Sequence, residues 1–263
     1  MQIDYTAEAP HLRRSAPRSD ALRWFVSITV EVPDASHLSK AENQGTVGVD
    51  LGVCAMATLS TGEKIVGPKS HTALLERLRR LSRSLSRKVK GCANRHKARA
   101  KLARLHARIA DIRSDALHKL TSELARRFDT IGVEDLNVRG MMANRRLART
   151  ISDMSFYEFR RQVEYKADLR GGRVVVADRW FPSSKTCSGC GHKVDALPLA
   201  VRSWVCPSCG TIHDRDVNAA TNLKVMAASS AVSACGEEGS DRRRKTAVKP
   251  ASVKQEPDSK LAA

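Results

Sequence analysis

Four of the seven cysteines in this chain fall into two pairs with the spacing of a metal site. Cys187 and Cys190 are separated by two residues, as are Cys206 and Cys209, and 15 residues lie between the pairs. Two intervening residues let both sulfurs of a tight turn reach one metal ion, and the longer segment can form a hairpin that closes a tetrahedral site. The pattern predicts a four-cysteine zinc ribbon with a structural role, because four sulfurs leave no open coordination position for catalysis.

Two other interpretations of the cysteines are disfavoured. A redox pair or chance spacing would not produce two such pairs at ribbon distance. His192 and His213 stand beside the pairs and could replace a cysteine as ligand, but with four cysteines present we expect both histidines at the surface. The odd cysteine count and the lack of a hydrophobic leader over Met1 to Asp20 argue against a disulfide framework.

Three acidic residues could also act together. Asp50 follows Gly48 by two positions and Glu134 follows Gly132 in the same way, so each glycine and its acid point to one face of an expected strand. We expect the bare glycine to leave room beside the carboxylate for metal ions and a phosphate backbone. Asp216 begins the last expected helix and could join the two strand acids.

Such carboxylates would repel one another unless cations lay between them. Two Mg²⁺ or Mn²⁺ ions about 3.5–4 Å apart could activate a water and stabilise the leaving oxygen of a phosphodiester. Oxygen ligands without histidine favour these metals over zinc. Asp214 competes with Asp216, and one of the two could cap the helix. Asp135 competes with Glu134, but its side chain faces the opposite way.

The elements that must position these residues are strands and helices in a mixed α/β order. Strands are expected over residues 22–32, 46–53, 55–60, 63–66, 130–135 and 173–177. Helices are expected over 155–170 and from about 215 to 227, with a basic helical hairpin at 71–127 that breaks near Lys90 to Cys92. The ribbon at 180–213 is thereby inserted before the last helix. Residues 1–21 and the tail from Ser229 onward have no such pattern and are expected to be disordered.

The charge balance indicates the class of partner. The chain of 263 residues has a formal net charge of +18, which favours a polyanion, most simply nucleic acid. Between residues 71 and 113, 14 basic residues face only Glu76 and Asp111. The 41% of hydrophobic residues supports a core, yet no stretch approaches the 18 apolar residues of a membrane span. We therefore expect a cytoplasmic protein with no membrane partner and no small-molecule substrate.

Over about residues 22–227 the chain resembles the TnpB/OrfB proteins of bacterial insertion sequences, which are RNA-guided DNA endonucleases related to type V CRISPR effectors. The segments that carry the resemblance are VGVDLGV (47–53), IGVEDLNVRGM (131–141), FPSSKTCSGCG (181–191), WVCPSCG (204–210) and HDRDVNAATN (213–222). The resemblance implies an α/β fold of the RuvC-like ribonuclease H type, split by a zinc ribbon. It also implies that Asp50, Glu134 and Asp216 are catalytic, since the D-x-N-A-A pattern favours Asp216 over Asp214, and that Cys187, Cys190, Cys206 and Cys209 bind zinc.

In the resembled family, the region of the basic hairpin borders a channel for guide RNA and target DNA. The hairpin could therefore contact phosphates without regard to sequence, although a solvated charged face is the simpler alternative. The candidate nucleic-acid-binding residues are Arg77, Arg80, Arg83, Arg87, Lys88, Lys97, Arg99, Lys101 and Arg104.

The resemblance also implies a division of the chain. We expect a disordered N-terminus (1–21), a remnant of a wedge domain (22–43), a nuclease domain (44–179), the ribbon (180–213), a last nuclease helix (214–228) and a disordered tail (229–263). Family members usually carry a wedge barrel and a recognition domain before the nuclease, whereas Trp24 to Val32 resembles only the last wedge strand. We therefore expect an N-terminally truncated member.

The function implied by the resemblance is a transposon-encoded, RNA-guided, metal-dependent DNA endonuclease. Its cofactors would be one structural Zn²⁺ and two catalytic Mg²⁺ or Mn²⁺ ions, and its partners DNA and a guide RNA from the end of the element. The alternative is a catalytically silent nucleic-acid-binding remnant or repressor of the same family. Strand-transfer transposase chemistry is disfavoured, because the ribbon and its surrounding motifs match the guided nucleases.

Overall fold

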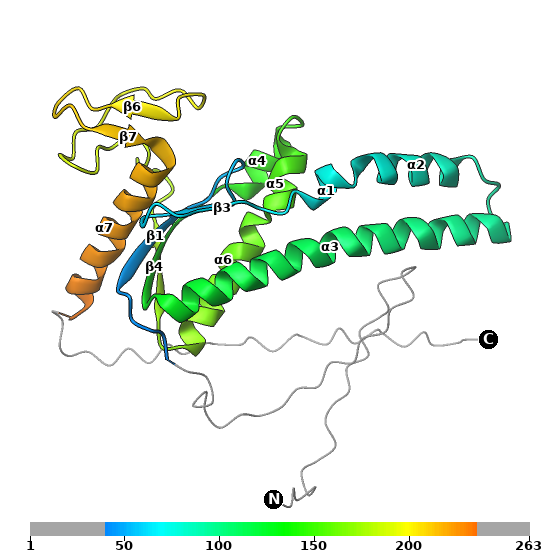
Figure 1. Ribbon diagram of the computed structural model, residues 1–263, viewed down its shortest axis with the longest axis horizontal. Helices are drawn as coiled ribbons and strands as arrows, with labels where there is room; N and C mark the ends of the chain where they lie inside the picture. Colours follow the sequence, from blue (N-terminus) through cyan, green and yellow to red (C-terminus); the bar gives the residue numbers. More distant parts are fainter. Residues whose placement is uncertain (1–39, 236–263) are drawn as a thin grey trace, which may run out of the picture.

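The computed structural model describes residues 40–235. Within that range the protein is a mixed α/β structure, with helices on both faces of a five-stranded sheet and a smaller module of two strands beside it (Figure 1). The strand expected at 22–32, the N-terminal segment 1–21 and most of the wedge remnant lie outside the described residues, as does the tail from 236 to 263.

The five strands of the large sheet are β1 (Thr46–Asp50), β2 (Ala57–Leu59), β3 (Lys64–Ile65), β4 (Thr130–Glu134) and β5 (Arg173–Ala177). Their order is β3-β2-β1-β4-β5, in which β1, β2 and β3 form an antiparallel meander and β4 runs parallel to both β1 and β5. The expected meander is therefore confirmed, and Gly62 makes its second turn with a φ of 91°. Gly48 lies opposite Gly132 in the parallel register of β1 and β4, so their flanking acids reach the same edge.

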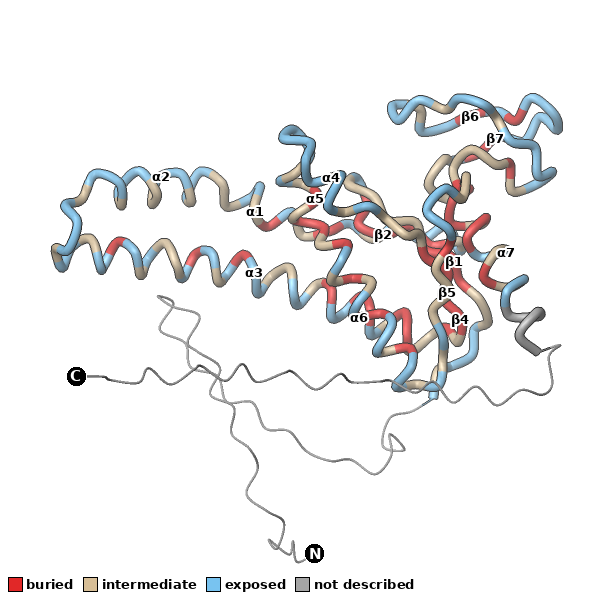
Figure 2. Tube along the Cα trace, turned by 180° about the vertical axis from the view of Figure 1, so that it is seen from behind, coloured by how far each residue is buried: buried red, intermediate tan, exposed pale blue. Residues whose placement is uncertain are grey.

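One face of the sheet carries the main hydrophobic core, which α3 (Ala93–Arg127) and α6 (Phe156–Leu169) cover. Val47 and Val49 of β1 are fully buried against this side, because alternate residues of a strand point to the same face. Leu124 of α3 and Phe159 of α6 are each 1% exposed and complete the layer. Buried residues concentrate accordingly in the sheet and in the parts of these helices nearest to it (Figure 2).

The other face of the sheet packs directly against the backbone of α7 (Arg215–Cys235). A Cβ atom at Gly48 would lie 1.9 Å from the carbonyl oxygen of Ala220, and one at Gly132 would lie 2.5 Å from that of Leu223. Glycine is therefore needed at both positions, because the backbone of α7 lies so close to β1 and β4 that no side chain fits between them. On the helix side, the small, buried side chain of Ala220 allows the same close approach. The expectation that the glycines leave room for metal ions is wrong, because α7 fills that space.

The basic segment forms the expected hairpin. The short α1 (Ser70–Ala73) leads into α2 (Leu75–Ser86), and α3 returns after a break that includes Lys90 to Cys92. Arg95 closes the turn by donating hydrogen bonds to the carbonyl oxygens of Leu85 and Lys88. At 1.5 Å per residue α3 is about 50 Å long, so the paired helices extend well beyond the sheet (Figure 1).

Three features of the helices differ from the prediction or were not predicted. α4 (Val138–Ala143) and α5 (Ala148–Met154) follow β4, and α7 continues to Cys235 instead of ending near residue 227. The prediction of a disordered tail from Ser229 onward is therefore wrong for residues 229–235, which belong to α7. None of the helices in the described part of the chain is long and apolar enough to cross a membrane.

Candidate functional site

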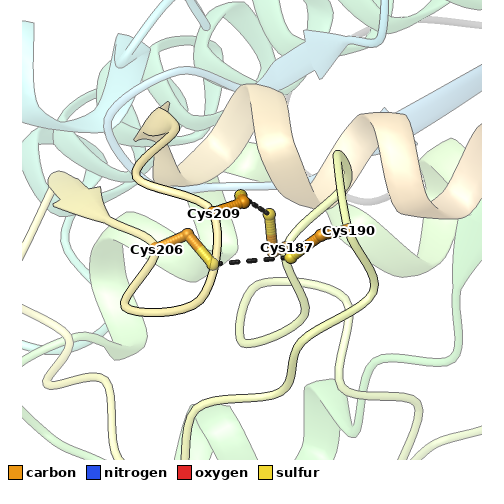
Figure 3. A group of neighbouring side chains, drawn as sticks. All are labelled: Cys187, Cys190, Cys206 and Cys209. Carbon is orange, nitrogen blue, oxygen red and sulfur yellow. Dashed lines mark hydrogen bonds between the residues drawn. The ribbon is translucent and has the colours of Figure 1, made fainter.

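The four paired cysteines form a compact cluster (Figure 3). Their sulfur atoms all lie within 4.8 Å of one another, with Cys187 to Cys209 at 3.7 Å and Cys190 to Cys206 at 3.6 Å. Sulfur atoms around a tetrahedral zinc, each about 2.3 Å from the ion, are about 3.8 Å apart. The predicted ligands are thus brought together at a separation that suits one zinc ion.

The backbone around the cysteines differs in detail from the expected single hairpin. The second pair lies in the turn between β6 (Ser203–Val205) and β7 (Ile212–Asp214), which pair antiparallel. The first pair lies in its own turn, closed by a bridge between Thr186 and Lys193. Gly191 and Gly210 end the two turns with φ of 76° and 73°, which lets each amide donate to the carbonyl of the first cysteine of its pair.

The two histidines beside the cysteines have different environments. His192 is exposed, as expected. His213 is buried, and its Nε2 lies 3.0 Å from the Sγ of Cys187. Its ring packs against that of Trp204 at a centroid distance of 4.9 Å, with the two ring planes tilted by 36°. The expectation of a surface position for His213 is therefore wrong. Its place on β7 turns the ring into the small core of residues 180–213, which we call the cysteine module.

The three candidate acids come together from three distant segments. Asp50 ends β1 and Glu134 ends the neighbouring parallel β4, so both lie at the same edge of the sheet. Asp216 lies in the first turn of α7, which crosses that face. Burial raises the pKa of Asp50 well above its usual value, and the negative charges of Glu134 and Asp216 raise it further. Asp50 therefore lies within electrostatic range of the other two carboxylates. The three acids are less tightly grouped than the cysteines, whose sulfur atoms all lie within 4.8 Å of one another.

Two polar residues that sequence reasoning missed support these acids. The hydroxyl of Ser183 donates a hydrogen bond to Oε1 of Glu134, and this bond partly offsets the increase in the pKa of Glu134 that burial causes. Arg202 donates to Oδ1 of Asp216 at 3.4 Å. Both belong to the cysteine module and are distant in sequence from their partners, so no local spacing could have identified them.

The two competing acids have other partners. Asp214 caps α7, since its Oδ1 accepts hydrogen bonds from the amides of Asp216 and Val217 at 3.1 Å each. Its other oxygen pairs with Lys64 at 2.7 Å. Asp135 faces away from the cluster and accepts hydrogen bonds from Arg160 and Arg179, each at 2.8 Å. The sequence-based preference for Asp216 and Glu134 is consistent with these contacts.

Comparison with known proteins places the chain in a family. A family model described as "Probable transposase" (OrfB_IS605) matches residues 26–145, and the Cas12f1-like TNB domain matches residues 156–223. A protein of Streptomyces pristinaespiralis named "Putative RNA-guided DNA endonuclease" is 49% identical over 240 residues, which cover 91% of this chain and 58% of that protein. The chain belongs to the TnpB/OrfB family.

Other TnpB/OrfB relatives match a similar part of the chain. InsQ of Escherichia coli K12, which bears the same descriptive name, is 36% identical over 230 residues, 82% of this chain and 56% of InsQ. This chain therefore spans little more than half the length of these relatives. A cryo-EM structure of a Cas12f1–sgRNA–target DNA complex matches 76% of this chain and 53% of its own, with a TM-score of 0.49 and 18% identity.

The nine predicted nucleic-acid-binding residues all lie on the helical hairpin of this TnpB/OrfB chain, and most of them are exposed. Of the nine candidates, all are exposed except Lys88, which is half-buried. A surface cavity of about 370 Å³ at the C-terminal end of α2 is lined by Arg80, Arg83, Ser84, Arg87 and Lys88. Four basic residues around one hollow attract an anion, so the hairpin has the electrostatic character that phosphate binding needs.

Proposed function

We propose that this chain is the nuclease part of an RNA-guided, metal-dependent DNA endonuclease. The observation that carries the proposal is the convergence of Asp50, Glu134 and Asp216 at the carboxyl end of β1 and β4, with the pKa of Asp50 raised by burial and by the other two charges. Groups with perturbed pKa values concentrate at functional sites. The names of the relatives support DNA as substrate and RNA as guide.

The fold that we propose is a RuvC-like ribonuclease H domain. Its support is the β3-β2-β1-β4-β5 order, in which an antiparallel meander is followed by two strands parallel to β1, with the acids at the ends of the first and fourth strands and on the closing helix. The proposed domain occupies residues 44–179 and 214–228, and the cysteine module interrupts it between β5 and α7.

The three carboxylates suit hard divalent cations. They offer oxygen ligands and no histidine, which is the donor set of Mg²⁺ or Mn²⁺. We propose two such ions, which would supply activation of the attacking water and stabilisation of the leaving oxygen of a phosphodiester. The protein's own part is orientation: Ser183 holds the carboxylate of Glu134, and Arg202 holds that of Asp216.

The proposed role of zinc at the cysteine cluster is structural. The side chain of Asn218 on α7 accepts a hydrogen bond from the amide of Ser188 at 2.9 Å and donates one to the carbonyl of Thr186 at 2.7 Å. Asn218 is two residues from Asp216, so a folded cysteine module holds the first turn of α7 in place. Zinc would therefore act on catalysis through position alone.

Cleavage by the purified protein tests this function. Single-stranded and plasmid DNA would be incubated with Mg²⁺, with and without RNA transcribed from the flanking element, beside Asp50→Asn and Asp168→Asn. Asp168 is an exposed acid near the end of α6, at the opposite end of the sheet, and serves as the matched control. Cutting that only Asp50→Asn abolishes supports the proposal. No cutting by a folded, zinc-loaded protein would instead support nucleic-acid binding without cleavage.

A further inference from the structure

A cavity of about 480 Å³ opens at the carboxyl end of β4, on the face of the sheet that α6 covers. Leu51, Val133 and Phe159 give it an apolar floor, and Glu134 forms part of its wall. The cavity therefore adjoins one carboxylate of the proposed nuclease site while lying across the strand ends from α7. Its volume is in the range of pockets that hold small organic groups, about 300–1,000 Å³.

Three of the four arginines that line this cavity are paired with carboxylates, and the fourth, Arg139, is exposed. Arg160 and Arg179 both donate to Asp135, and Arg161 pairs with Glu158 at 2.7 Å. Guanidinium groups held in this way keep their planar shape and their remaining N–H donors but have little net charge to offer a phosphate. The apolar floor and the three paired arginines thus favour an uncharged ring with polar edges, while the exposed Arg139 supplies one further positive charge beside it.

An exposed aromatic side chain stands at the rim. Tyr157 is the second residue of α6, lines the cavity and is 72% exposed. The preceding residue, Phe156, is 2% exposed and fixes the start of the helix in the core, so the tyrosine is presented from a rigid base. A large ring left in solvent beside an apolar hollow offers a stacking surface for a second ring.

We propose that this cavity receives one unpaired nucleobase of the DNA strand that is cut, stacked on Tyr157. The proposal rests on the function proposed above, because Glu134 borders both sites and the base would be a close neighbour of the reacting phosphate. Stacking accepts every base, since each has an aromatic face. The contact therefore positions the strand for cleavage without reading its sequence, and it requires the strand to be unpaired.

Photo-crosslinking tests the contact directly. A single-stranded oligodeoxynucleotide containing 5-iododeoxyuridine would be bound to the protein in a buffer without Mg²⁺ or Mn²⁺, so that no cleavage occurs, and irradiated. Peptide mapping by mass spectrometry is expected to find a cross-link at Tyr157. Cross-links confined to other segments, such as the basic hairpin, would overturn the proposal, as would cross-linking at Tyr165.

Affinity measurements with a matched pair of variants provide the second test. Tyr157→Ala is expected to weaken single-stranded DNA binding about tenfold in a buffer without Mg²⁺ or Mn²⁺ and to leave duplex binding unchanged. Tyr165→Ala removes a tyrosine from the same helix that is 37% exposed and does not line the cavity, and it should bind like the parent protein. Equal effects of the two variants, or none, would refute the base site.

The two proposals can fail separately. Binding that depends on Tyr157 in a protein that never cuts DNA would refute the endonuclease and retain the base site. Cleavage that is abolished by Asp50→Asn but unaffected by Tyr157→Ala, with an unchanged affinity for single strands, would retain the endonuclease and refute the base site.

Discussion

At the scale of single residues, the glycine and the acid of the repeated Gly-x-acid pattern serve different purposes. Asp50 and Glu134 each follow a glycine by two positions, and that regularity correctly brought the two acids to one edge. The glycines themselves serve α7, whose carbonyl of Ala220 lies where a Cβ of Gly48 would be. Sequence alone could show that no side chain is wanted at position 48 but not what fills the space, because the helix that does so begins more than 160 residues later.

Gly48→Ala is therefore expected to destabilise the protein by about 3 kcal/mol, since the added methyl group meets helix backbone that no rotamer change can move aside. Chemical denaturation followed by circular dichroism measures the loss. Gly189→Ala is the control, because the nearest atoms to its added Cβ lie at an ordinary 3.7 Å. Equal stability of the two variants would contradict the close packing of α7.

Asp214 and Asp216 form a matched pair for separating stability from chemistry. Asp214→Ala removes the cap of α7 and should cost about 1 kcal/mol of stability while leaving most cleavage intact. Asp216→Ala should lower the cleavage rate by roughly 1,000-fold or more with little loss of stability, because it relieves repulsion at Asp50. Thermal unfolding and cleavage rates measured side by side check both; the reverse pattern would assign the catalytic role to Asp214.

At the scale of elements, sequence patterns predicted what is regular and missed what depends on distant contacts. Alternating strands and the basic hairpin follow from local periodicity, and those expected within residues 40–235 agree with the structure within a few residues. α5 was missed because a seven-residue helix is not stable alone. It is fixed by Ile151 and Met154 in the core, and its buried Asp153 accepts hydrogen bonds from the amides of His71 and Thr72. The buried position of His213 and the contact of Ser183 were also missed, because each depends on a residue that is distant in sequence, Cys187 and Glu134 respectively.

The hairpin makes a prediction that belongs to this scale. Replacing Arg80, Arg83 and Arg87 together by alanine should weaken binding to any nucleic acid and reduce the slope of log K against log salt concentration by about 2–3, because each lost phosphate contact removes close to one released counterion. Fluorescence anisotropy over a salt series measures this slope. Lys119→Ala on α3 is the control, since Asp115 already matches its charge at 2.7 Å. An unchanged slope in the triple variant would show that α2 is a solvated face.

At the scale of the whole molecule, residues 40–235 contain two hydrophobic cores, which meet at the first turn of α7. The main core lies between the sheet, α3 and α6, whereas Cys187, Trp204 and Cys206 form a separate small core in the cysteine module. The link between them consists of polar contacts, among them Asn218 to Ser188 and Thr186. The cysteine module can therefore lose its order while the main core stays folded, and the acid that would be misplaced is Asp216.

Cys206→Ser tests this coupling. We expect the variant to lose the zinc ion that we propose for this cluster and, with it, the order of the module, since small metal modules rarely fold without their ion. Hydrogen exchange should then rise in residues 186–214 and in the first turn of α7, and remain slow in β1, β4 and β5. DNA cleavage should fall at least tenfold, because losing the groups that orient the ligands of a metal site typically lowers activity about 10–100-fold. Cys92→Ser, at a half-buried cysteine in the turn of the helical hairpin, should change neither measurement. If β1 and β4 lost protection together with the cysteine module, the two cores would be one cooperative unit, and zinc would stabilise the whole fold instead of positioning Asp216.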